Sequence, residues 1–161
     1  MFRVTVRKDE LVSQRDLTLA DYHYAFLTSR LFTLELSILQ GVGLASPETT
    51  TREHLREVAD GTAQSFALWS VKFQESSATS SEILMRASTP DQKPFCDTWW
   101  MIDHKKKDGD YCELVFGTAL IAERESWIVW AATPLHRLYS RLLLASAKES
   151  LLQTAAEKKP D

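Results

Sequence analysis

The chain has 161 residues and a net charge of −3, with 44% hydrophobic and 25% charged residues. This length predicts a single domain with one core, in a composition ordinary for a globular protein. The acidic balance argues against a nucleic-acid-binding protein, and no apolar run approaches the ~20 residues that span a bilayer.

The N-terminal part of the chain predicts one strand and two helices. Residues 2–8 alternate apolar and basic side chains, as in a short edge strand or an N-terminal arm. The aromatic alternation that begins residues 21–30 is consistent with another strand. Apolar residues at helical spacing then predict a helix up to Gly41, and a second, short and polar helix follows over about 51–60.

From residue 65 the apolar period changes to two, which predicts a run of antiparallel strands. These strands comprise residues 65–73, residues 82–89 and a hairpin within 96–120 that turns in a three-residue loop at Gly109. One face of the hairpin is expected to carry Trp100, Ile102, Leu114 and Phe116. The other is expected to carry Trp99, Met101, Val115 and Ala119. The hairpin is therefore apolar on both faces.

The two cysteines fall far apart in this register, which places Cys112 opposite His104 and Cys96 well along the neighbouring strand. A disulfide between them is not expected, because bridged residues need Cα atoms within about 7 Å. Two thiols fit a reducing cytoplasm. Residues 1–12 contain no apolar core segment, so no signal peptide is expected.

A long C-terminal helix is predicted after residue 125, with a break at Pro134 and a solvated tail over 154–161. Its expected apolar stripe consists of Leu135, Leu138, Leu142 and Ala145. The whole pattern predicts an α+β fold in which a curved antiparallel sheet packs on this helix, with two short helices after the first strand. The single core is expected over about residues 20–153.

No strong catalytic signature is present. The sequence contains no phosphate-binding glycine motif, no nucleophile elbow, no HExxH and no paired CxxC. Its four histidines lack metal-ligand spacing to one another. We therefore predict no metal and no cofactor.

Residues 134–141 (PLHRLYSR) hold the densest group of polar side chains. Two pairs four residues apart share helix faces, with Tyr139 between them: His136 with Ser140, and Arg137 with Arg141. One interpretation is the polar end of a pocket, in which Arg141 or Arg137 binds an anionic head group. The alternative is structural, with arginines beside the apolar stripe that pair with acids such as Glu35, Glu82 or Asp97.

Glu35 interrupts the apolar run of the first predicted helix, which Arg30 precedes. It is either surface-facing or a buried acid with an arginine partner, and burial can convert such an acid into a general acid or base. Asp97 is open to the same two interpretations. The adjacent Trp99 and Trp100 point to opposite faces of their strand, so one is expected in the core and the other at a cavity or dimer contact.

The chain resembles a group of uncharacterised bacterial proteins over about residues 20–147. The shared segments are DYHYAFLTSRLFTLELSIL, GTAQSFALWSV, SEILMRA, LVFGTAL and PLHRLYSRLLLASA. Their layout is similar to that of the helix-grip superfamily, which includes START-like, polyketide-cyclase-like and pollen-allergen-like domains. The resemblance implies a curved sheet around the C-terminal helix, with an apolar ligand bound between them. The chain departs from the usual pattern in having five or six strands instead of seven.

Three functions are consistent with this pattern. The first is binding of a small hydrophobic or lipid-like ligand between sheet and helix, for which the candidate residues are Arg30, Glu35, Trp100, His136, Tyr139 and Arg141. The second is a cyclase- or hydrolase-like enzyme that uses Glu35, Asp97 or His136 as acid or base in the same cavity. The third is a homodimerising domain with an exposed aromatic face and no ligand.

Overall fold

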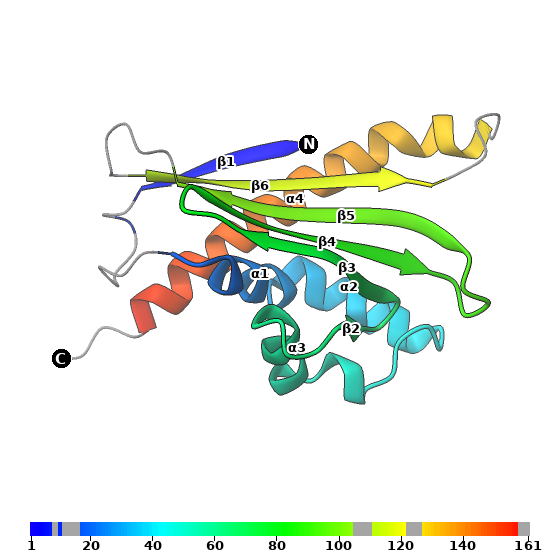
Figure 1. Ribbon diagram of the computed structural model, residues 1–161. Helices are drawn as coiled ribbons and strands as arrows, with labels where there is room; N and C mark the ends of the chain where they lie inside the picture. The colour runs from blue at the N-terminus through cyan, green and yellow to red at the C-terminus, as the bar shows by residue number, and fades with distance from the viewer. Residues whose placement is uncertain (8–9, 11–16, 105–110, 122–126, 158–161) are drawn as a thin grey trace.

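A computed structural model of the chain describes residues 1–7, 10, 17–104, 111–121 and 127–157, with side chains in the last range described at 134 and 136–153. A six-stranded antiparallel sheet packs against helices on one of its faces (Figure 1). In chain order the elements are β1 Phe2–Arg7, α1 Leu19–Leu27, α2 Arg30–Gly41, the 3-10 helix η2 Glu48–Thr50, α3 Arg52–Ala59, β2 Ser65–Phe66, β3 Trp69–Ser76, β4 Ser80–Ser88, β5 Pro94–Asp103, β6 Tyr111–Leu120 and α4 Trp127–Glu157. The predicted α+β class is confirmed.

The strands follow the order β1-β6-β5-β4-β3-β2 across the sheet. Strands β2 to β6 are therefore sequential neighbours. Strand β1 joins the far side of β6 as an edge strand, which was one of the two predicted alternatives. The long helix α4 runs alongside the sheet and contacts β1, β6 and α1 (Figure 1). Helix α2 lies beside α4, and α3 packs on α1.

The β5–β6 hairpin has the predicted register. Trp100 pairs with Phe116 and Ile102 pairs with Leu114, and all four side chains are buried on the helix-covered face. The same register places Trp99 opposite Gly117 on the other face. The predicted loop around Gly109 lies outside the described residues.

Aromatic rings fill the centre of the space between the sheet and helix α1. The Trp100 ring lies 5.3 Å from Phe26 of α1, edge-on, and 5.7 Å from Phe116 of β6. Phe26 and Phe116 are themselves 4.7 Å apart. These three rings are almost completely buried, and such contacts add about 0.5–1.5 kcal/mol per pair beyond the burial of their area.

Residues 21–27 form part of helix α1, so the strand expected there is wrong. Thr18 and Asp21 form a capping box that starts the helix, since each side chain bonds the other's backbone N–H. The buried Leu19, Tyr22 and Phe26 then recur at helical spacing. The sequence suggested a strand because Tyr22, Tyr24 and Phe26 alternate along it. Tyr24 belongs to the outer side of the helix, so it is not part of the buried helical stripe.

The strand predicted over residues 65–73 is divided by a tight turn. Phe66 of β2 pairs with Trp69 of β3, and their rings stack at 5.3 Å. Ala67 between them has a φ of 45°, in the left-handed region that non-glycine residues seldom adopt. A bulge between Val71 and Phe73 further shifts the register of β3 against β4.

Helix α4 continues through Pro134 without the predicted break, and it buries a different stripe from the one expected. Leu138 and Leu142 are 55% and 51% exposed, whereas Leu143, Leu144, Ala147 and Leu151 are buried. Three consecutive leucines, at 142 to 144, leave the spacing ambiguous. The stripe that carries the small Ala147 is the one that faces the sheet and α1.

Both cysteines are free thiols, as predicted, and both are buried. Cys96 pairs with Leu120, and Cys112 pairs with Val6. In the described part of the chain, no helix combines the length and apolar character needed to cross a bilayer.

His23 of α1 is fully buried in the aromatic core, with its ring 4.8 Å from that of Trp100. Neither of its ring nitrogens has a hydrogen-bond partner among the described residues. Burial disfavours the imidazolium form and lowers the pKa of His23 to about 3. The side chain therefore acts as a neutral member of the core.

This burial predicts an acid-sensitive fold. The unfolded chain has a His23 pKa of about 6.5, so it binds more protons than the folded chain below that pH, and stability is lost as the pH falls. Between pH 7 and pH 5 the free energy of unfolding should fall by about 2 kcal/mol from this group alone. Urea denaturation at the two pH values should show this loss in the wild type and lack it in His23→Leu. Equal losses in both proteins would contradict the assignment.

Candidate functional site

The face of the sheet that no described helix covers carries an apolar groove of about 500 Å³. Four residues form a row directly across four adjacent strands, because each is the register partner of the next: Phe73, Leu84, Trp99 and Gly117. Met1 and Ala119 extend the apolar lining at the β6 side. Phe73 remains 43% exposed, so the groove opens to solvent along the sheet.

Trp99 is held in a fixed position within this groove. Its indole N–H donates a hydrogen bond of 2.9 Å to Oε2 of Glu82 on β4. On its other side the ring lies next to Gly117 of β6, where an added Cβ would make only ordinary van der Waals contact with the indole atom Cε3, at 3.5 Å. The groove therefore has a preformed aromatic surface.

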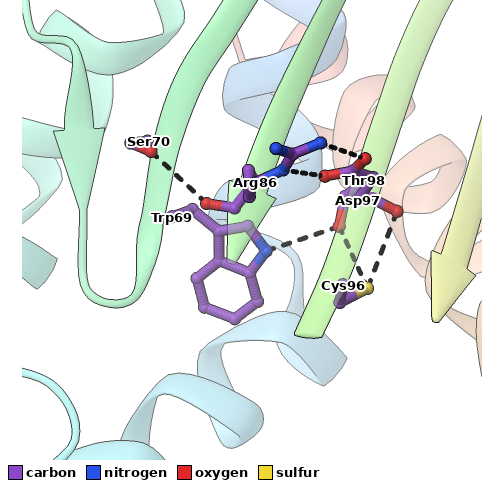
Figure 2. A network of polar contacts seen from close by, with 6 residues as sticks. All are labelled: Trp69, Ser70, Arg86, Cys96, Asp97 and Thr98. Carbon is purple, nitrogen blue, oxygen red and sulfur yellow. Dashed lines mark hydrogen bonds and ion pairs between the residues drawn. The ribbon is translucent and has the colours of Figure 1, made fainter. Parts of the chain in front are cut away.

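The charged groups at the rim of the groove are bound to one another. The Arg86 guanidinium donates two hydrogen bonds to the Asp97 carboxylate, at 2.7 and 2.9 Å (Figure 2). This pairing holds the pKa of Asp97 below its ordinary value. With Asp97 bound to Arg86, and Glu82 bound to Trp99, the groove offers mainly apolar contact.

Glu35 and Tyr139 are brought together, as a polar pair between α2 and α4. The Tyr139 hydroxyl donates a 2.6 Å hydrogen bond to Oε2 of Glu35. Burial raises the pKa of the Glu35 carboxyl, and the bond from Tyr139 partly opposes that rise. Burial and the neighbouring carboxylate also raise the pKa of Tyr139. The pair therefore joins a half-buried carboxyl and a phenol in direct hydrogen-bond contact, which are residue types that serve as general acids and bases.

His136 lies one helical turn before Tyr139 and is hydrogen-bonded through Nε2 to the Thr118 hydroxyl on β6. Burial lowers the pKa of His136. On the neighbouring strand, the Thr98 hydroxyl accepts from Trp69 Nε1 at 3.4 Å and lies 3.8 Å from the Cys96 sulfur (Figure 2). These groups add polar atoms to the helix-covered side of the sheet.

The other predicted residues lie elsewhere. Trp100 is 1% exposed in the aromatic core. Arg141 is exposed on α4, with its guanidinium 5.4 Å from the Phe2 ring. Arg30 lines a separate polar pocket at the start of α2. Asp97 points to the open face of the sheet, away from Glu35 and His136. The six predicted binding residues therefore do not form one site, although Glu35 and Tyr139 are in direct contact and His136 lies one helical turn from Tyr139.

The sequence did assign Trp99 and Ala119 to the open face, but it missed the contribution of Phe73. An unbroken alternation puts Phe73 on the same side as Trp69, which is the helix-covered side. The bulge after Val71 adds a residue to β3 and turns Phe73 to the open face instead. No residue in this stretch gives a local signal for the bulge.

Comparisons with protein-family models, curated proteins and solved structures gave no match to this chain. Within the described residues, no group of three or more His, Cys, Asp or Glu side chains is placed to hold a metal ion.

The Glu35–Tyr139 pair yields a direct prediction. Tyr139→Phe removes the donor that favours the ionised carboxylate, so the pKa of Glu35 should rise further. The free energy of unfolding at pH 7 should fall by about 1–2 kcal/mol, because a half-buried carboxylate loses its hydrogen bond. An NMR pH titration of the Glu35 carboxyl carbon and urea denaturation measure the two effects. Tyr111→Phe, which removes a hydroxyl that does not contact Glu35, is the matched control. A Glu35 pKa unchanged by Tyr139→Phe would show that the bond is not formed.

Proposed function

We propose that the protein is a binding module for a small hydrophobic or lipid-like molecule, which it holds in the groove on the open face of its sheet. The observation that carries this proposal is the cross-strand row of Phe73, Leu84, Trp99 and Gly117. A face of a sheet that is left to water usually carries polar side chains. Here it carries a contiguous apolar surface, and such surfaces mark binding sites.

The size and chemistry of the groove support a small ligand. Its volume of about 500 Å³ lies within the range of about 300–1,000 Å³ found for small-molecule sites. The Trp99 indole supplies a large rigid contact area, already oriented by Glu82. Because Asp97 is bound to Arg86, a ligand need not bring a charge to satisfy it. An uncharged, mainly apolar molecule fits these conditions best.

Native mass spectrometry of protein purified without detergent tests the proposal. We expect a monomer whose native mass exceeds the denatured mass by roughly a few hundred daltons, which is the mass range of drug-sized ligands. Extraction of that species then identifies the molecule. A clean dimer with no added mass would assign the open face to a second copy of the chain and overturn the ligand proposal.

The groove can also be tested by substitution. Phe73→Glu places a charge in the apolar row and should weaken binding of the uncharged dye N-phenyl-1-naphthylamine by roughly tenfold or more, because a carboxylate must be desolvated. Leu142→Glu is the matched control, since Leu142 is similarly exposed but lies on α4. Fluorescence titration gives both affinities. The groove is not the site if Phe73→Glu binds the dye as tightly as Leu142→Glu does.

A further inference from the structure

A second pocket, of about 350 Å³, lies among the helices and shares no lining residue with the groove. It is formed where α1 ends, where α2 and α3 begin, and along the C-terminal half of α4. Its principal side chains are Tyr24, Thr28, Arg30, Arg52, Arg56 and Glu149. Unlike the groove, it is lined mainly by polar groups.

The pocket concentrates positive charge on an acidic protein. Three arginines line it against one glutamate, so its lining carries a net charge of +2 while the whole chain carries −3. None of the three arginines forms an ion pair with any residue that the structure describes. Glu149 instead accepts a 3.1 Å hydrogen bond from the Gln153 side chain. Within the described residues, the three guanidinium groups therefore have no ion-paired carboxylate.

The pocket also orients one of these arginines. The Arg56 guanidinium carbon lies 3.6 Å from the centroid of the Tyr24 ring, in a cation–π stack. Stacking fixes the plane of the guanidinium and leaves its N–H groups available at the ring's edge. A planar, fixed guanidinium is suited to bidentate binding of an oxyanion.

Two helices begin at this pocket. Arg30 is the first residue of α2, and Arg52 is the first residue of α3. The Ser29 side chain before α2 makes no capping bond, and its buried hydroxyl has no partner within the described part of the chain. The Leu31 N–H instead donates to Ser146 Oγ of α4, at 3.4 Å. The positive end of the α2 dipole, which Ser29 does not cap, thus adds to the arginine charge.

From this convergence we infer that the pocket binds the phosphoryl group of a small molecule. A phosphomonoester carries about −1.5 to −2 charges at pH 7, close to the +2 of the lining, and it offers three acceptor oxygens to three guanidinium groups. The pocket volume of about 350 Å³ is large enough for a compact molecule. The pocket is separate from the groove, so this inference does not depend on whether the groove binds a hydrophobic ligand.

Isothermal titration calorimetry with inorganic phosphate and with glycerol phosphate, at an ionic strength held constant with sodium chloride, tests the inference. We expect one-to-one binding of both probes to the wild type. Arg30→Gln combined with Arg52→Gln should weaken both by roughly tenfold or more, since each arginine supplies charge-assisted hydrogen bonds. Both side chains are exposed, so the fold should persist, which circular dichroism checks. Arg137→Gln, at an exposed arginine of α4 outside the pocket, should bind as the wild type does.

The two probes distinguish the source of the phosphoryl group. Tighter binding of glycerol phosphate than of inorganic phosphate would assign the pocket to a phosphorylated metabolite, and the reverse order would assign it to free phosphate; either result supports the inference. Three results would overturn it: no heat from either probe with the wild type, equal affinity in the double variant, or binding of citrate without binding of phosphate.

Discussion

The packing of Trp100 against Phe26 and Phe116 determines how the rest of the molecule is arranged. These rings join the centre of the sheet to helix α1, and α1 in turn packs on α4. The Tyr22 hydroxyl, which donates to the Val115 carbonyl at 3.1 Å, adds a polar bond to the same contact. Once this side of the sheet is covered, the residues that alternate with Trp100 along β5 must face the other way.

That alternation explains why the β5–β6 hairpin is apolar on both faces. Trp100 and Phe116 supply the core, whereas Trp99 and its neighbours supply the groove. Leaving an indole partly in water forgoes the free energy of burying it, which is up to about 1.5–3 kcal/mol for a large apolar side chain. The bond to Glu82 orients that indole without a covering helix. A molecule bound in the groove would bury the part of the indole that is left in water.

The sequence predicted the features that follow from local periodicity. The hairpin register followed from the loop expected at Gly109 and not from alternation, because the hairpin is apolar on both faces. Three features depended on local or tertiary contacts, which the spacing of apolar residues along the sequence does not reveal. The residues around Tyr24 alternate like a strand but follow a capping box, Phe73 changes face at a bulge, and α4 buries Leu143 instead of Leu142. The arginine pocket was hidden for another reason, since Arg30, Arg52 and Arg56 come from two helices far apart in the sequence from the α4 residues beside them.

The two buried thiols make local opening of the sheet measurable, because each becomes reactive only when its surroundings open. Cys96 lies near the start of β5 and Cys112 near the start of β6, so they mark opposite ends of one strand pair. Burial also raises the pKa of Cys96, which suppresses the reactive thiolate while the sheet is closed. Alkylation of native protein must therefore wait for each end of the sheet to open. The labelling rate of Cys96 would report opening at the end where α2 meets the sheet, and the rate of Cys112 would report opening beside β1. No cysteine has to be introduced by mutation for this measurement.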